Sequence, residues 1–287
     1  MALSKIDAGG LEYSGRWITR LHRQHFRDSG YMVIRNVIPA ELAANAVREI
    51  TSFLGADLAD NATWYGGAPV LDGLVPLHHA QALWDIRQHP NLYEMFVEFF
   101  GSHRLMVDIN RCLFRPPIRP GSTLSYGTIH WDGDPKALGP GSIQAVVLLT
   151  DVRANGGGFQ CLPEIYQNLN AWLQQHASHK NFDFFNPNLN ECTTTQVEGD
   201  AGDVILFSSK LPHGSATNCS NRPRIAAFVT MQPPANDAEV RELMKSWWLT
   251  KRAPDYWRGM PGQLDPEPGP PAVLSELGMK LIGVLPW

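Results

Sequence analysis

The sequence lacks the features that would place the chain in a membrane. It contains no run of about 18 apolar residues, which is the length that a membrane-spanning helix needs. The segment from Met1 to Gly10 has neither a basic stretch nor an apolar one, so we expect no signal peptide. These absences predict a cytoplasmic protein without a membrane partner.

Paired cysteines and an excess of basic charge are also missing. The four cysteines are widely spaced and form no CxxC pair, which excludes a zinc ribbon and indicates reduced thiols, as is usual in the cytoplasm. The formal net charge of −4 and the isoelectric point near 6.2 argue against a nucleic-acid partner. What remains is a small-molecule partner, and a monomer and a homodimer both fit a chain of this kind.

The composition is that of an ordinary globular protein, with 44% hydrophobic and 18% charged residues. We find no internal repeat, low-complexity tract or linker, so we expect one domain over residues 1–287. Its core is expected at about 26–233, followed by a C-terminal helix and an irregular tail over 234–287.

Short strands dominate the expected secondary structure. Alternating or β-branched segments predict strands at 31–38, 105–114, 125–131, 142–150, 159–162, 193–197, 203–207 and 224–232. Helical spacing of apolar residues predicts helices at 18–29, 40–54, 90–100, 165–176 and 236–250, and the stretch 61–76 reads as a loop. The pattern predicts a mainly β protein with flanking helices, folded as a double-stranded β-helix, the cupin-like jelly roll.

Two histidines and a carboxylate form the most informative pattern. His130 and Asp132 are two residues apart, so on a strand both side chains leave the same face. His213 follows 83 residues later (213 − 130) in a Leu-Pro-His-Gly stretch. Two imidazoles and one carboxylate are the ligands that hold non-haem Fe(II) and leave other coordination positions open. Asp134 lies on the same face of the strand and is the alternative carboxylate ligand.

An arginine follows the second histidine at a short distance. Arg224 lies 11 residues after His213 (224 − 213) and begins the apolar run 225–229, so its guanidinium is expected to be partly buried. The planar fork of arginine matches a carboxylate with two parallel hydrogen bonds. Ser215 could add a hydroxyl to the same carboxylate, and Arg222 is the alternative cation.

Taken together, these motifs resemble the phytanoyl-CoA dioxygenase family of Fe(II)/2-oxoglutarate oxygenases. The resemblance spans roughly 26–233 and rests on His130-x-Asp132, Leu148–Asp151, Asn155-Gly-Gly-Gly158, Gly202–Phe207, His213-Gly-Ser215, Asn218 and Arg224. Where the family often has Pro-Gly-Ser-His after the glycine-rich turn, this chain has Pro163-Glu-Ile-Tyr166, which leaves the substrate contacts of that segment open.

The resemblance implies a ligand set. Iron would bind His130, Asp132 and His213, and Arg224 with Ser215 would hold the C5 carboxylate of 2-oxoglutarate. Family members usually add a polar co-substrate contact from the strand before the first histidine, here 107–112, where Asn110 and Arg111 are the candidates. Gln144 is expected to face the same pocket. In the long segment before the strands that carry the ligands, the candidates for substrate contact are Trp64, Tyr65, His79 and Trp84.

The implied activity is a dioxygenase that uses Fe(II), 2-oxoglutarate and O2 to hydroxylate or desaturate a small or medium organic metabolite, as in natural-product metabolism. Succinate and CO2 would be released. The intact Asp132 favours oxygen insertion or desaturation over halogenation, because related halogenases lack this carboxylate. Two other functions fit the same residues: a zinc-dependent hydrolase that activates water on His130, Asp132 and His213, and a non-catalytic jelly-roll protein that binds a small ligand.

Overall fold

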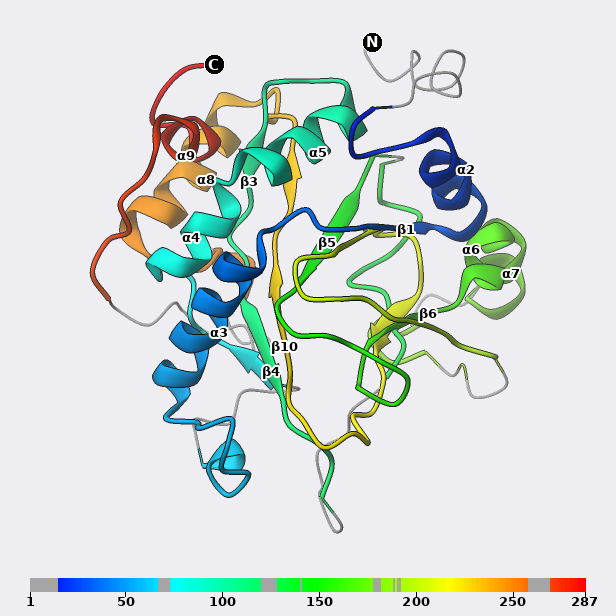
Figure 1. The fold of residues 1–287 in the computed structure, drawn as a ribbon. Coiled ribbons are helices and arrows are strands. Elements are labelled where there is room, and N and C mark those ends of the chain that lie inside the picture. Colours follow the sequence, from blue (N-terminus) through cyan, green and yellow to red (C-terminus); the bar gives the residue numbers. More distant parts are fainter. Residues whose placement is uncertain are drawn as a thin grey trace.

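The computed structural model describes residues 15–66, 73–119, 128–139, 141–177, 182–187, 189, 192–257 and 269–287, without the side chain of Tyr256. Its centre is an antiparallel sheet of six strands in the order β1-β8-β5-β10-β4-β2 (Figure 1). These strands are β1 (Tyr31–Ile34), β2 (Leu74–Val75), β4 (Cys112–Arg115), β5 (Ile143–Leu148), β8 (Val204–Ser208) and β10 (Arg224–Phe228).

A smaller sheet packs against the main one. It has the order β7-β6-β9 and consists of β7 (Thr195–Val197), β6 (Phe159–Cys161) and β9 (His213–Ser215). A two-stranded pair, β3 (Met106–Val107) with β11 (Met231–Gln232), continues the main sheet at the ends of β4 and β10. Strands that are distant in sequence thus pair throughout, which is the connectivity of a jelly roll.

The main sheet is buried on both faces. Along β8, Val204 and Leu206 join a core cluster under the helices, whereas Ile205 and Phe207 join a second cluster with side chains of β6 and β7. We call these the helix face and the inner face. Successive side chains of a strand point to opposite faces, so each strand sends alternate residues to each cluster. Burial on both sides explains why β8 is apolar throughout.

Helices cover the helix face and the edge beyond β1. The layer over the helix face contains α3 (Ala40–Leu54), α4 (Gln81–Arg87), α5 (Pro90–Phe100), α8 (Ala238–Thr250) and α9 (Glu276–Leu281), each with side chains in the same cluster as the sheet. On the other side of the molecule lie α2 (Arg20–Ser29), α6 (Pro163–Gln167) and α7 (Leu169–His176) (Figure 1). Two single 3₁₀ turns, η2 (Thr63–Tyr65) and η4 (Asp255–Trp257), complete the described elements.

Two helices have the predicted bounds because their ends are marked in the sequence. The helix α5 begins with Pro90 at its first position and ends at Gly101, whose φ of 63° is left-handed. Proline suits the first helical turn, and glycine adopts the left-handed conformation without a steric penalty. The helix α3 likewise spans 40–54 and ends at Gly55 with φ 64°.

Other predicted elements are shorter or divided. The strand expected over 31–38 ends at Ile34, since Asn36 has φ 54° and its amide donates to the carboxylate of Asp203. The strands expected over 105–114 and 224–232 each divide in two, and the helix expected over 165–176 divides at Asn168. Part of the strand expected over 125–131 falls outside the described residues, and His130 itself forms an isolated bridge.

Regular structure also occurs where none was expected. The stretch 61–76 was expected to be a loop, and its described part contains η2 and β2. The helix α4 was not predicted, and the tail after Lys251 contains η4 and α9. Ser275 begins α9 by accepting a hydrogen bond from the amide of Gly278, a normal N-cap that the surrounding prolines obscured.

Within the described part of the chain, no helix combines the length and the apolar character that crossing a bilayer requires.

Candidate metal centre and carboxylate pocket

Main-chain pairing brings the two histidines together. The amide of His130 donates to the carbonyl of His213 at 2.9 Å, and the amide of His213 donates back to the carbonyl of His130 at 3.0 Å. His213 begins β9, which is fixed to the smaller sheet by pairing with Cys161 of β6. A residue pair separated by 83 positions (213 − 130) is therefore joined by two backbone hydrogen bonds.

The side chains converge on one point. Asp132 Oδ1 lies 3.5 Å from His130 Nε2, and Asp132 Oδ2 lies 3.4 Å from His213 Nε2. One potential ligand atom of each residue lies within 4.8 Å of the others, so the three side chains could hold a metal ion. Two ligands that are each about 2.1 Å from one ion and at right angles lie about 3 Å apart, close to these separations.

Both imidazoles have a defined tautomer. Nδ1 of His213 lies 2.9 Å from the carbonyl oxygen of Leu211, and Nδ1 of His130 lies 3.2 Å from that of Thr128. A carbonyl oxygen only accepts, so each Nδ1 carries the hydrogen, and in the neutral imidazole Nε2 then presents a lone pair. This is the usual orientation of a metal-binding histidine.

The electrostatics of the cluster favour a cation. Partial loss of hydration beside the two histidines raises the pKa of Asp132, but the hydrogen bonds and charges of His130 and His213 outweigh this effect, and the pKa lies well below its usual range. The carboxylate is therefore ionised. Two imidazole lone pairs and an ionised carboxylate that face one another repel unless a proton or a metal ion lies between them. The donor set thus fits a divalent ion such as Fe(II).

A second cluster of polar groups lies at the other end of β9. Arg224 is 3% exposed, and its Nη1 donates to the hydroxyl of Ser215 at 2.9 Å and to the carbonyl of Gly157 at 2.8 Å. Its Nε is buried, and no residue in the described part of the chain accepts a hydrogen bond from it. Burial, and then the positive charge of Arg115, lowers the pKa of Arg224 to about 9, so it remains charged near neutral pH. A buried cation with an unused donor is suited to bind an anion.

Gly157 shows why the glycine-rich turn is needed here. Its φ is 72°, and a Cβ at this position would lie 2.8 Å from the Cβ of Asn218. Only a residue without a side chain can place its carbonyl against Arg224 without strain.

Arg115 was not among the sequence candidates, yet it faces Arg224. The register of β4 on β10 pairs the two arginines directly, both are buried, and Nη1 of Arg115 lies 3.4 Å from the carbonyl oxygen of Ser215. The sequence did contain a signal for Arg115: like Arg224, it borders an apolar strand. Gln160 is also buried, and its Nε2 lies 3.3 Å from the same carbonyl.

The structure places the candidates Asn110 and Arg111 elsewhere. They lie before β4, whereas the pairing partner of Arg224 is at the end of that strand. The carbonyl of Asn110 accepts from Arg87, and the guanidinium of Arg111 lies 4.6 Å from the ring centroid of Trp257. These two residues are therefore not brought together with Ser215 and Arg224, and the strand contributes Arg115 instead.

Gln144 is close to the metal cluster. It shares the inner face of β5 with Val146 and Leu148, and its Nε2 donates to Asp132 Oδ2 at 2.6 Å. The expectation that it faces the pocket agrees with this position, but the contact is with the carboxylate of the triad.

The four aromatic and histidine candidates for substrate contact have other neighbours. Trp84 is 2% exposed and packs against Trp248 with 4.7 Å between ring centroids, and His79 packs against the same tryptophan. Trp64 donates to the carbonyl of Asp57, and Tyr65 donates to that of Pro117. Trp84 and His79 thus lie in the helical layer, whereas Trp64 and Tyr65 are partly exposed and contact backbone carbonyls.

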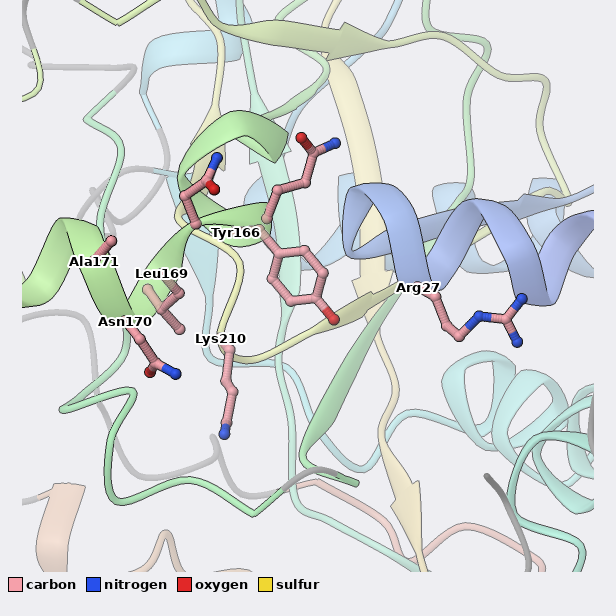
Figure 2. A pocket seen from close by; sticks show the side chains of 8 residues that line it. Arg27, Tyr166, Leu169, Asn170, Ala171 and Lys210 are labelled. Carbon is pink, nitrogen blue, oxygen red and sulfur yellow. The ribbon is translucent and has the colours of Figure 1, made fainter. Parts of the chain in front are cut away.

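A separate hollow lies between α2 and the α6–α7 junction (Figure 2). Its volume is about 540 Å³, and its lining includes Arg27, Tyr166, Asn168 and Lys210. None of the residues proposed from the sequence to bind metal or co-substrate lines it. It does include Tyr166, from the segment in which this chain departs from the family pattern.

Comparison with known proteins identifies the class of the chain. Residues 26–226 match the phytanoyl-CoA dioxygenase (PhyH) family, which is more than half of the 287 residues, so the chain belongs to this family. Membership of this family supports the assignment of the chain as an oxidoreductase. A Dictyostelium discoideum protein provisionally named phytanoyl-CoA dioxygenase is 23% identical in an alignment of 271 positions that covers 76% of this chain and 76% of that one.

Solved structures confirm the predicted jelly-roll fold. HygX from Streptomyces hygroscopicus, crystallised with nickel and 2-oxoglutarate, is similar with a TM-score of 0.53 and 16% identity, over 78% of this chain and 94% of that one. The non-haem α-ketoglutarate-dependent epimerase SnoN from nogalamycin biosynthesis also has a TM-score of 0.53 and 16% identity, over 90% and 95% of the two chains.

Proposed function

We propose that this protein is an Fe(II)/2-oxoglutarate-dependent dioxygenase. The observation that carries the proposal is the combination of two clusters on one short strand. His213 at the start of β9 belongs to the metal-binding set, and Ser215 at its end contacts the buried Arg224. Two residues along a strand span about 7 Å. A dicarboxylate of five carbons can therefore bind metal at one end and a guanidinium at the other.

The co-substrate would be held by two cations. Arg224 would form charge-assisted hydrogen bonds with the C5 carboxylate of 2-oxoglutarate, with the hydroxyl of Ser215 beside it. Arg115, paired with Arg224 across the sheet, would add a second positive charge in place of the Asn110 or Arg111 contact that the sequence suggested. The mutual repulsion of the two buried guanidiniums would be relieved when the anion binds.

The residues of the chain would position the reactants and exclude water. His130, Asp132 and His213 would hold the ion on one side, which leaves the remaining positions to 2-oxoglutarate and O2. Bound Fe(II) and 2-oxoglutarate supply the oxidising chemistry, with release of succinate and CO2. The apolar inner face, including Phe159 and Phe207 against the ring of His213, would keep bulk water from the reacting centre.

The substrate is proposed to be a small or medium organic metabolite, hydroxylated or desaturated. The intact Asp132 supports this outcome over halogenation, and the likeness to a nogalamycin-biosynthesis enzyme supports a role in natural-product metabolism. The zinc hydrolase would leave two buried arginines beside Ser215 without a function, and a non-catalytic binding protein would leave the set of His130, Asp132 and His213 without one. The cytoplasmic location, the single domain and the oligomeric state stay predictions.

The test is an anaerobic titration of Fe(II)-loaded protein with 2-oxoglutarate. A weak visible charge-transfer band should appear as the co-substrate chelates the iron, and it should be absent in His130→Ala. Under O2, succinate should then form. A folded, iron-loaded protein that gives no band would contradict the proposal and favour the zinc enzyme or the binding protein.

A further inference from the structure

Gln144 joins a rigid strand to the carboxylate of the metal cluster. It lies in β5, near the middle of the main sheet, and pairs with Phe207 of β8. Its amide nitrogen is 2.6 Å from Asp132 Oδ2, a short hydrogen bond between side chains 12 residues apart. An ionised carboxylate only accepts hydrogen bonds, so the amide group must present its nitrogen to it.

Asp132 needs such support more than the two histidines do. Both histidines are fixed by their mutual backbone bridge and by carbonyls at Nδ1. Asp132 lies in a bend outside any named strand, and its side chain is 51% exposed. A half-exposed aspartate on an irregular segment can rotate, and it can offer either one oxygen or both to an ion.

The two carboxylate oxygens have different surroundings. Oδ1 lies 3.5 Å from His130 Nε2 and Oδ2 lies 3.4 Å from His213 Nε2, but Oδ2 also accepts a hydrogen bond from Gln144. A hydrogen bond to one oxygen fixes the plane of the carboxylate and occupies a lone pair that would otherwise be available to the ion. A carboxylate bound through both oxygens would fill one more coordination position, and those positions are needed for 2-oxoglutarate and O2.

We infer that Gln144 is a positioning residue that restricts Asp132 to binding metal through one oxygen. The inference rests on the proposed function, because it assigns a role within the same metal centre. It gives a specific role to a residue that was expected to face the co-substrate pocket. Removal of a hydrogen-bond partner that orients a metal ligand typically lowers metal affinity by about 10- to 100-fold.

The experiment is an anaerobic titration of the full-length protein with Co(II), whose visible spectrum reports the geometry around the ion, followed by 2-oxoglutarate. Gln144→Leu removes the donor, Gln144→Asn shortens it by one methylene, and Gln144→Glu replaces it with a repelling carboxylate. The matched control is Gln232→Leu, since Gln232 also donates to a carboxylate, that of Asp108, at 2.9 and 3.1 Å.

We expect Gln144→Leu to weaken Co(II) binding by about 10- to 100-fold and to change the cobalt spectrum, with a smaller loss for Asn and a larger one for Glu. Gln232→Leu should match the wild type in both readouts. Wild-type affinity and spectrum in the Leu and Asn variants would overturn the inference while leaving the proposed function intact. If the Leu variant does not fold, an unchanged Asn variant alone overturns it. A wild-type protein that binds neither Co(II) nor 2-oxoglutarate would instead refute the proposed function.

Discussion

Replacement of Arg224 by methionine separates binding of the co-substrate from folding and from metal binding. Methionine keeps much of the apolar volume of the arginine side chain and removes its charge and its donors. The variant loses the hydrogen bonds to Ser215 at 2.9 Å and to Gly157 at 2.8 Å, and it no longer has a charge beside Arg115.

The magnitudes follow from these contacts. Hydrogen bonds to a charged group contribute about 1.5–3 kcal/mol, and 1.4 kcal/mol is about a factor of ten, so the affinity for 2-oxoglutarate should fall by about 12- to 140-fold. Without 2-oxoglutarate, stability should change by less than about 1.5 kcal/mol, because the lost hydrogen bonds are offset by the relief of burying two like charges.

The assay is the same Fe(II) titration with 2-oxoglutarate, combined with thermal unfolding with and without it. A ligand that binds the folded state raises the melting temperature, so 2-oxoglutarate should stabilise the wild type and not the variant. Arg222→Met is the control, since Arg222 is exposed and only two residues away. The reasoning is refuted if Arg224→Met binds 2-oxoglutarate normally, and the role moves to the neighbouring residue if Arg222→Met loses affinity.

Three further predictions concern the metal, the turn and the helical layer. Asp132→Ala should abolish succinate formation and weaken metal binding, whereas retained turnover would exclude it as a ligand. Gly157→Ala should lower the free energy of unfolding by about 1–2 kcal/mol in urea titrations, since its φ of 72° and the nearby Asn218 both oppose a side chain; unchanged stability would contradict the assigned strain. Burial, followed by Arg87, lowers the pKa of His79 to about 4 and that of His78 well below its usual value. Unfolded histidine takes up its proton near pH 6.5 and the folded residues only at lower pH, so stability should rise with pH between about 4 and 6.5. Urea titrations of His79→Asn should show a weaker rise, and an equal one would show that this residue does not contribute.

The sequence predicted those parts of the molecule that are encoded locally. Pro90 and Gly101 mark the ends of α5, and the His130-x-Asp132 spacing places two of the three potential ligands side by side. Arg224 was likewise identified from the apolar run that it begins, and the structure buries it beside Ser215.

The sequence did not predict features that depend on tertiary pairing. Whether Asn110, Arg111 or Arg115 faces Arg224 is decided by the register of β4 on β10, and no local pattern encodes that register. The divided strands have the same origin, because the regular pairing is interrupted between the backbone hydrogen bonds that Asp108 forms with Thr230 and Arg111 with Phe228. Trp84 seemed available to a substrate because its burial depends on Trp248, 164 positions later (248 − 84).

The backbone bridge between His130 and His213 has a consequence for loss and recovery of the metal. Joining two points of a flexible chain 83 residues apart (213 − 130) carries an entropic cost that grows with the length of the loop. Here the peptide groups, together with the sheet around β9, already hold the ends in place, so an arriving ion has no loop to close. Removal of the metal by a chelator should therefore leave a folded apoprotein. Rebinding of the metal should take a single fast step without a refolding phase.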